Sequence, residues 1–258
     1  MIRRAAMQDH FEAVAHFYRG VRTTDDEPVR FIRDALAGYD RLDAADVGCG
    51  DGRYDVLLFR YLKNLRLTCI DISAAMLDAL SLHLKAQGIS DFKTLTASVD
   101  DLDLKAESLD CVFTFNAVHH FNFADFLART GRALRSKGRI FIYTRTPEQN
   151  ESSIWGRLFP EFCEREQRLY SLDAMVRWVD EAVGLNLVAA KIFRYPRRAS
   201  LERLLTQARS CHYSTFSLYG AEEFERASRT FEDSVRRRYS DLAAIEWSDE
   251  NTLLEIAK

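Results

Sequence analysis

The spacing of hydrophobic residues changes near position 42 of the chain. Before it, apolar residues follow a helical period, which predicts one helix from Met7 to Gly20 and a second that begins near Glu27. After it, short apolar runs alternate with amphipathic segments, a pattern typical of β–α units that build a parallel sheet. The strands expected in this region are Ala44–Val47, Arg66–Ile70, Phe92–Thr96, Leu109–Phe115 and Arg139–Thr144.

The alternation becomes less regular after Tyr143. It predicts a helix from Leu172, a strand from Leu185 to Phe193, further helices, and a final strand over Thr252–Ala257. We therefore expect an α/β protein with a Rossmann-like, doubly wound, mostly parallel seven-stranded sheet. A helical N-terminal segment and helical insertions near the C-terminal half would complete it.

Three glycines interrupt the pattern between the first strand and the helix after it, in the run Gly48-Cys49-Gly50-Asp51-Gly52. A strand, a glycine-rich loop and a helix together can bind a nucleotide-containing ligand. Asp71 ends the next strand about 20 residues later, where a carboxylate can accept hydrogen bonds from ribose hydroxyls. Without a ligand, the glycines would form only a tight turn, and Asp71 would still be favoured near the N-terminus of the following helix.

The sixth position of the glycine loop narrows the choice of ligand. A dinucleotide fingerprint requires a small residue there, because helix, strand and pyrophosphate crowd together. This chain has Arg53 at that position, so the loop favours a ribose-containing ligand without a pyrophosphate.

The segments "ADVGCGDGRY", "TCIDIS" and "VFTFNAVHHF" resemble motifs of the class I S-adenosylmethionine (SAM)-dependent methyltransferases, including the type 11 and type 25 members, over Asp46 to Arg145. The resemblance implies SAM as the cofactor, with S-adenosylhomocysteine as its product. It also implies one methyltransferase domain over residues 1–258. Within it, residues 1–40 would form an N-terminal helical cap and 41–145 the cofactor-binding core, and residues 146–170 and 195–240 would be substrate-cap insertions.

The resemblance further implies which residues contact the cofactor. Asp46 would orient its amino group, Asp71 would hold the ribose hydroxyls, and Tyr18 and Arg22 would clamp its carboxylate. The methionine and ribose parts would be lined by Gly48, Cys49, Gly50 and Gly52, the adenine by Ile72 and Met76, and the methionyl end by Asn116 and Ala117. Many members carry an acid after the third strand to bind the adenine amino group. Here Ser98 stands at that place, so Ser98 with the Val99 backbone, or Asp100, would take this role.

Methyl transfer requires mainly that nucleophile and methyl group be held in line. A general base is needed only when the nucleophile carries a proton, and histidine suits that role. The candidate catalytic residues are His119, His120, Tyr143 and His212. For the adjacent His119 and His120 we favour a structural or cofactor-shaping role over catalysis.

The two insertions are rich in aromatic and arginine residues that could close over an apolar or anionic small-molecule acceptor. These residues are Tyr143, Arg145, Trp155, Arg157, Phe159, Phe162, His212, Tyr213 and Tyr219. For any single aromatic residue, a place in a satellite core under a long connection is the favoured interpretation.

Composition excludes some classes of function. The net charge of −3 is not that of a dedicated nucleic-acid-binding protein, and no run of about 18 apolar residues predicts a membrane span. The five cysteines form no C-x-x-C pair, and the six histidines show no metal-site spacing. The sequence therefore predicts a soluble cytoplasmic protein without a metal.

Arginines concentrate locally over residues 194–209 and 236–238, beside several glutamates. Such runs are usually solvated, although "GCGDGRY", "VHHF" and "IYTRTPEQ" also resemble methyltransferases of modified wobble uridine in tRNA. The leading hypothesis is transfer of a methyl group to a small molecule, and a tRNA acceptor is the alternative. A second alternative, motivated by Ser98, is a non-catalytic SAM-binding protein.

Overall fold

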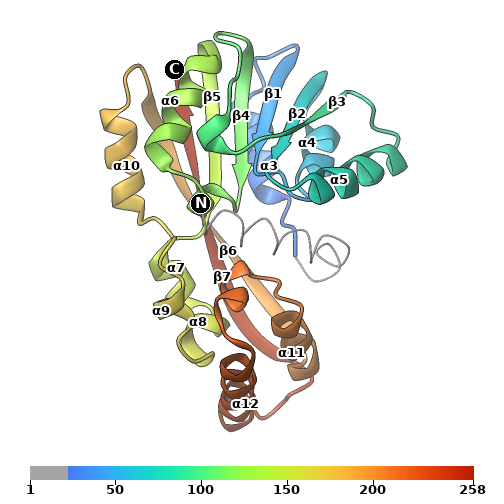
Figure 1. The fold of residues 1–258 in the computed structure, drawn as a ribbon, viewed down its shortest axis with the longest axis vertical. Coiled ribbons are helices and arrows are strands. Elements are labelled where there is room, and N and C mark those ends of the chain that lie inside the picture. The colour runs from blue at the N-terminus through green and yellow to red at the C-terminus, as the bar shows by residue number, and fades with distance from the viewer. Residues whose placement is uncertain (1–22) are drawn as a thin grey trace.

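A seven-stranded sheet forms the upper part of the molecule in a computed structural model that describes residues 23–258 (Figure 1). The strand order is β3-β2-β1-β4-β5-β7-β6, and β7 runs opposite to the other six strands. The strands are β1 (Leu42–Val47), β2 (Leu65–Asp71), β3 (Phe92–Thr96), β4 (Leu109–Phe115), β5 (Leu134–Thr144), β6 (Asn186–Ala199) and β7 (Ile245–Ala257). This confirms the expected doubly wound, mostly parallel fold. The helix expected over Met7–Gly20, with Tyr18 and Arg22, lies outside the described residues.

Helices cover both faces of the sheet. Apolar side chains of α3 (Glu27–Ala35), α4 (Asp55–Tyr61) and α5 (Ala74–Ala86) pack on one face, and those of α6 (Phe123–Ala133) and α10 (Leu172–Glu181) on the other. The start of α5 shows why the chain folds this way locally. The Ser73 hydroxyl accepts a hydrogen bond from the Met76 backbone N–H at 3.3 Å, which caps the helix, and a leucine-rich stripe then enters the core.

The last two strands extend far beyond the lengths predicted from the sequence. We expected strands over Leu185–Phe193 and Thr252–Ala257, but β6 continues to Ala199 and β7 begins at Ile245. Figure 1 shows the two strands leaving the sheet as a ribbon toward the lower part of the molecule. Arg194–Ala199 and Ile245–Glu250 pair along this ribbon. The extension was missed because these segments are rich in charged residues, and the hydrophobic pattern that marks a strand is weak there.

The lower part of the molecule is a helical lobe with a core of its own. It contains α7 (Pro147–Ser152), α8 (Ile154–Leu158), α9 (Phe162–Arg165), α11 (Leu201–Arg209), α12 (Ala221–Arg238) and the 3-10 turn η3 (Ser214–Leu218). Trp155 stacks on Phe231 of α12, with ring centroids 5.0 Å apart, and Phe159 and Phe162 are buried in the same cluster. Phe159 and Phe162 therefore lie in a satellite core, the interpretation favoured for any single aromatic residue of the insertions.

Two short 3-10 turns, η1 (Val99–Asp101) and η2 (Val118–His120), follow β3 and β4. Both lie where the parallel strands end, which is the edge at which this type of sheet binds ligands. Within residues 23–258, we find no helix with the length and apolar character needed to cross a membrane.

Candidate functional site

Two hollows meet at the carboxyl edge of the parallel strands. The first, here called the loop cleft, has a volume of about 1150 Å³ and follows the glycine loop and the ends of β2, β3 and β4. The second, here called the interlobe pocket, has a volume of about 240 Å³ and lies between the sheet and the helical lobe. Both are lined by Arg53, Tyr54, Asn116, His119, His120 and Ser214. A ligand in one hollow would therefore adjoin a ligand in the other.

The glycines of the loop serve different purposes. Gly48 has a φ of +76°, and a Cβ atom there would lie 2.5 Å from the Cβ of Ala117. Gly50 also has a positive φ, but a Cβ atom there would meet nothing within 4 Å, so the loop is open toward the cleft at this point. Gly48 thus allows the turn after β4 to approach, whereas Gly50 leaves room for a ligand.

The structure places Gly52 away from the loop cleft, in contrast to the role implied by the resemblance. A Cβ atom on Gly52 would lie 2.8 Å from Cγ of Leu80 on α5. This glycine is buried, and it lets α5 pack against the loop. Cys49, by comparison, lines the cleft as expected.

Asp71 joins the glycine loop to the start of α5. Its Oδ2 atom accepts the backbone N–H of Gly50 and its Oδ1 atom accepts that of Ser73, both at 2.9 Å. Burial raises the pKa of this carboxyl group, while the hydrogen bonds from Ser73 and Gly50 oppose that rise. Asp71 lines the cleft, so its remaining lone pairs face the space where ribose hydroxyls would lie.

A second carboxylate of the cleft lacks a hydrogen bond. Asp46 is 1% exposed, and its Oδ1 atom is buried without a partner. Burial, together with the charges of Asp55 and Asp71, raises the pKa of Asp46 well above its ordinary value. A cationic ligand group would offset this cost, so the amino group of a methionyl cofactor fits the acidic end of the cleft.

The other end of the loop cleft suits a flat base. Ile72, Met76, Ser98 and Val99 line it, together with Asp100. The Ser98 hydroxyl donates to Asp101 at 3.0 Å, which leaves its oxygen lone pairs to accept a hydrogen bond. Every cofactor residue implied by the resemblance within residues 23–258 therefore lines this cleft, with the exception of Gly52.

Asn116 stands where the two hollows meet. Its φ of +54° is unusual for a residue other than glycine, although asparagine tolerates it better than most. Its side-chain Oδ1 accepts a hydrogen bond from Asn251 of β7 at 2.9 Å, and Ala117 follows it in the cleft wall. The sequence analysis missed Asn251, because its strand was assigned to begin one residue later.

The four candidate catalytic residues lie at or near this junction, but they differ in chemistry. The rings of His119 and His120 are 4.1 Å apart and line both hollows. Burial raises the pKa of Tyr143 far above its ordinary value, so its phenol stays protonated and is unsuited to accept a proton. Nδ1 of His212 lies 3.0 Å from the Gln207 carbonyl oxygen. Because a carbonyl only accepts, Nδ1 carries the hydrogen and Nε2 has the lone pair.

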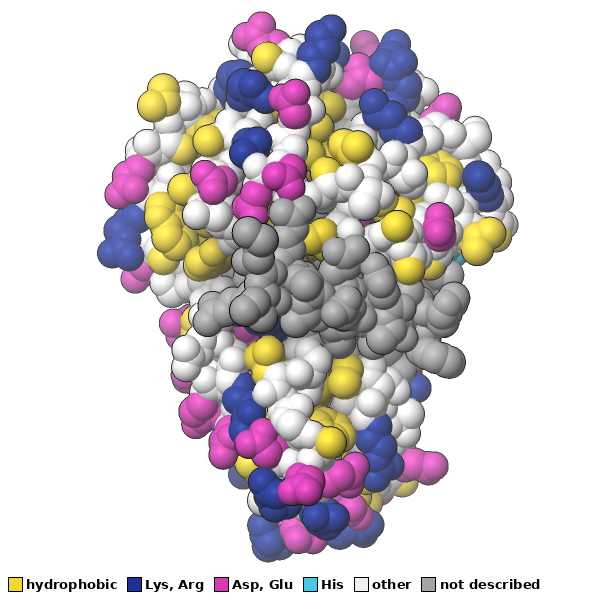
Figure 2. Space-filling model, in the orientation of Figure 1, with side chains coloured by type: hydrophobic (Ala, Val, Ile, Leu, Met, Phe, Trp, Pro, Cys, Tyr) yellow, Lys and Arg dark blue, Asp and Glu magenta, His cyan; other side chains and the backbone are white. Residues whose placement is uncertain are grey.

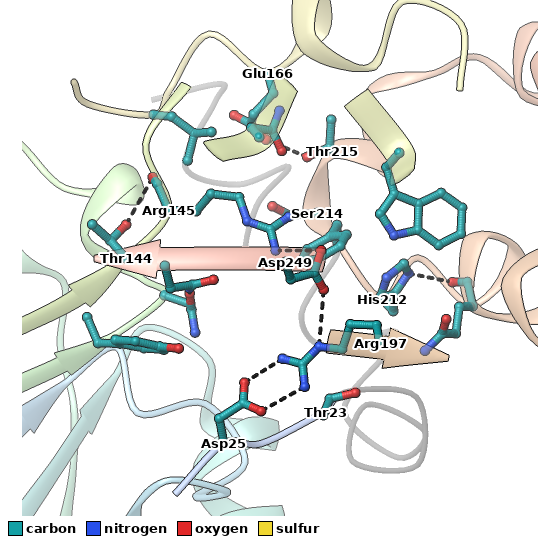
Figure 3. A pocket seen from close by; sticks show the side chains of 18 of the residues that line it. Thr23, Asp25, Thr144, Arg145, Glu166, Arg197, His212, Ser214, Thr215 and Asp249 are labelled. Atoms are coloured by element: carbon teal, nitrogen blue, oxygen red, sulfur yellow. Dashed lines mark hydrogen bonds and ion pairs between the residues drawn. The ribbon is translucent and has the colours of Figure 1, made fainter. Parts of the chain in front are cut away.

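Charged residues from distant parts of the chain meet in the interlobe pocket (Figure 3). Arg197 of β6 makes two hydrogen bonds to Asp25, at 2.8 and 2.6 Å, and its Nε atom lies 3.3 Å from Asp249 of β7. Arg145 lies 3.5 Å from Asp249 on the other side. The sequence offered no signal for Asp25 or Asp249, because their partners are more than 100 positions away or stand on the neighbouring strand.

The residues predicted to cover an acceptor divide into two groups. Arg145, Trp155, His212 and Tyr213 line the interlobe pocket. Arg157 and Tyr219 line neither hollow, and the Tyr219 hydroxyl donates to the Pro160 carbonyl at 2.6 Å inside the helical lobe.

Comparisons with known proteins match parts of this chain to methyltransferases. Residues 45–142 match the family described as "Methyltransferase domain". A Dictyostelium discoideum protein with a provisional methyltransferase name is 24% identical over 136 residues, which are 53% of this chain and 49% of that protein. The chain thus spans about half the length of this curated relative.

Solved structures share the fold. A provisionally assigned methyltransferase from Bacillus halodurans has a TM-score of 0.65 at 15% identity, covering 91% of this chain and 99% of the other. Geranyl diphosphate C-methyltransferase from Streptomyces coelicolor, in complex with Mg²⁺, geranyl diphosphate and S-adenosylhomocysteine, has a TM-score of 0.52 at 15% identity and covers 88% and 79%.

The strand order, the glycine loop and the acidic end of β2 define a Rossmann-like fold of the class I methyltransferase type. Residues 45–142, less than half of the chain, are similar to this methyltransferase domain family, and the solved methyltransferases share the fold, in agreement with the resemblance seen in the sequence. SAM is the cofactor of this class, and the loop cleft fits it.

Proposed function

We propose that this protein transfers a methyl group from SAM in the loop cleft to a small molecule in the interlobe pocket. The observation that carries the proposal is the shared wall of the two hollows at Asn116, His119 and His120. A donor and an acceptor placed on the two sides of this wall would meet there. Alignment of the two reactants can supply several kcal/mol of the barrier reduction in such a reaction.

Bound SAM would supply an electrophilic methyl group on a sulfonium. In our proposal Asp71 accepts hydrogen bonds from its ribose and keeps Gly50 in place through the bond described above. Asp46 pairs with its amino group through the buried Oδ1 atom. Ile72 and Met76 enclose the adenine, and Asn116 and Ala117 face the methionyl end.

The helical lobe would hold the acceptor and handle its proton. If the acceptor atom is protonated, the proton must leave as the bond to the methyl group forms. His212 lines the interlobe pocket and its Nδ1 atom contacts the Gln207 carbonyl, so we propose the His212 imidazole as the proton acceptor in preference to Tyr143.

The dimensions of the pocket support a small acceptor. Its volume of about 240 Å³ lies below the roughly 300–1,000 Å³ of most small-molecule sites, so it has room only for a small acceptor. Geranyl diphosphate, named for the Streptomyces coelicolor enzyme, is also a small molecule. The cytoplasmic location and the role of residues 146–170 and 195–240 as a substrate cap stay predictions.

The tRNA alternative gains no support from the local arginine excess. Arg194 pairs with Glu250 at 2.6 Å and Arg236 with Glu232 at 2.7 Å. Figure 2 shows basic and acidic side chains intermingled at the tip of the helical lobe rather than a uniform basic face. A surface that binds the phosphates of tRNA would require a uniform basic face.

Two measurements test the proposal. Isothermal titration should detect binding of SAM and S-adenosylhomocysteine, and incubation with methyl-labelled SAM and a small-molecule cell extract should label a product that mass spectrometry identifies. Absence of binding by folded protein would overturn the proposal. Binding without transfer to any extract fraction would favour the non-catalytic alternative, and salt-sensitive labelling of tRNA the other.

A further inference from the structure

A buried guanidinium group in the wall of the interlobe pocket lacks a full set of partners. Arg145 follows β5 directly and is 8% exposed. Its Nη1 atom is buried without a hydrogen bond. Its Nη2 atom lies 3.5 Å from Asp249, which is longer than a charge-assisted hydrogen bond of about 2.7–2.9 Å. Burying a charge is costly unless it is paired and hydrogen-bonded. Arg145 can therefore bind a further acceptor.

The neighbours of Arg145 hold it in place without satisfying it. Asp249 is shared, because Arg197 Nε lies 3.3 Å from one of its oxygens and Trp247 Nε1 lies 3.2 Å from the other. Arg197 has a full two-point pair with Asp25 in addition. The Arg145 guanidinium lies over the ring of Tyr213, 5.0 Å from its centroid. Tyr213 helps to orient the group and its side chain interacts with it, but the Nη1 atom still lacks a hydrogen bond.

The charged side chains that line the pocket are predominantly positive, like Arg145 itself. Among residues 23–258, five arginines and three carboxylates line the pocket. One of these carboxylates, Glu166, is occupied by Arg168 at the rim of the loop cleft and by the Thr215 hydroxyl at 2.6 Å. Although burial opposes it, the hydrogen bond from Arg168 lowers the pKa of Glu166, so this pair stays ionised and internally balanced. The remaining lining carries a positive excess.

We propose that the interlobe pocket selects acceptors that carry an oxyanion, a carboxylate or a phosphate, and binds that group on Arg145. This inference rests on the proposed methyl transfer, and it specifies the class of acceptor. The oxyanion would take the Nη1 hydrogen bond that the protein leaves unmade. The aromatic side chains of Tyr54, Trp155 and Tyr213 would enclose an apolar body. The methyl-accepting atom would then point to the junction at Asn116.

The other classes of acceptor fit less well. A neutral apolar molecule would leave the Arg145 Nη1 group buried and without a hydrogen bond, at a cost of a few kcal/mol. A cationic amine would enter a pocket with more arginines than carboxylates. An oxyanion removes both problems with one contact.

Binding of model anions tests the proposal directly. Protein loaded with S-adenosylhomocysteine is titrated calorimetrically with benzoate and, separately, with inorganic phosphate. The variants are Arg145→Met, which keeps the length but loses the charge, and Arg194→Met as the matched control. Arg194 is exposed, pairs with Glu250 and lies outside the pocket. The wild type and Arg194→Met should bind one of the two anions, and Arg145→Met should bind it at least tenfold more weakly.

Each outcome of this titration bears on the proposal. Binding of benzoate alone identifies a carboxylate, and binding of phosphate alone a phosphate. Failure of both anions to bind the wild type, or equal binding by Arg145→Met, overturns the proposal. If Arg145→Met does not fold, Arg145→Lys replaces it, with an expected partial loss because the charge remains while the second donor of the fork is lost.

A failure of the proposed function gives a different result. Arg145 does not line the loop cleft, so Arg145→Met should bind S-adenosylhomocysteine as the wild type does. If no form of the protein binds S-adenosylhomocysteine, the methyl-transfer proposal fails. The anion titration on the cofactor-free protein then still decides whether Arg145 is an anion site.

Discussion

The backbone N–H of Gly50 donates a hydrogen bond of 2.9 Å to the side chain of Asp71, which follows it by 21 positions. The other oxygen of this carboxylate accepts the N–H of Ser73. Both oxygens therefore face backbone donors, and the open side of the glycine loop depends on a residue at the end of a different strand. The glycine loop and Asp71, which the sequence analysis treated as two separate cofactor contacts, are thus joined by a hydrogen bond.

The variant Asp71→Asn should bind SAM at least tenfold more weakly. An amide must turn its own donor toward either Gly50 or Ser73, and loss of a charge-assisted hydrogen bond costs roughly 1.5–3 kcal/mol. Isothermal titration measures the affinity. Asp78→Asn, on the exposed side of α5, is the control and should bind as the wild type does. Equal affinity of the two variants would contradict the role given to Asp71.

The variant Gly48→Ala should lower the free energy of unfolding by roughly 2–4 kcal/mol. The new methyl group would lie 2.5 Å from the Cβ of Ala117, and the left-handed backbone at +76° adds strain for any residue with a Cβ. Urea unfolding measures the loss. Gly38→Ala is the matched control, since a Cβ there meets nothing within 4 Å, and it should change stability little. A similar effect of the two substitutions would argue against the close approach.

The variant Asp46→Asn should make the cofactor-free protein more stable at pH 8, by roughly 1–3 kcal/mol, and weaken SAM binding. Burial raises the pKa of Asp46 in the folded state, so the folded protein binds its proton more tightly than the unfolded chain does. The favourable contribution of Asp46 is therefore complete below the unfolded pKa of about 3.9 and is lost as pH rises through the folded value.

Thermal and urea unfolding of the wild type and Asp46→Asn, measured from about pH 4 to about pH 8, check the direction of this pH dependence. The advantage of the variant should shrink as the pH falls toward the lower limit, because the wild-type carboxyl group then becomes protonated too. A variant that is less stable than the wild type at pH 8, or that keeps the full SAM-induced rise in melting temperature, would contradict the pairing of Asp46 with a cationic group.

The variants His212→Gln and Tyr143→Phe separate two candidate catalytic residues. The first removes the Nε2 lone pair and should slow labelling of the product roughly 100-fold or more if the acceptor atom is protonated. The second removes a buried hydroxyl that stays protonated, and it should change the rate by less than about threefold. Rates of methyl incorporation from labelled SAM measure both. A larger loss in Tyr143→Phe than in His212→Gln would reverse the assignment.

Local patterns in the sequence predicted the strands of the sheet well where interactions between neighbouring residues decide the structure. The strands Phe92–Thr96 and Leu109–Phe115 have the predicted bounds. The glycine loop and Asp71 were found because their spacing follows from the strand–loop–helix unit itself.

The interlobe pocket depends on contacts that no local pattern records. Asp25 meets Arg197 across 172 positions, and Asp249 meets both Arg145 and Arg197 only because β6 and β7 extend beyond the sheet. Gly52 was assigned to the cofactor because a glycine motif does not reveal which glycine faces a ligand and which faces a helix. The sequence could not exclude Phe159 and Phe162 from an acceptor site, because an aromatic residue that fills a small core looks the same in sequence as one that covers a ligand.

Strand β7 contributes to both hollows of the site through two residues that lie on the same face of the strand. Asn251 holds Asn116 beside the donor cleft, and two positions earlier Asp249 holds Arg145 in the acceptor pocket. Residues two apart on a strand share one face, and a slip of one residue would turn both away together. The helices between β6 and β7 can therefore diverge and reshape the pocket over evolutionary time. The distance between methyl donor and acceptor would still be set by one continuous backbone.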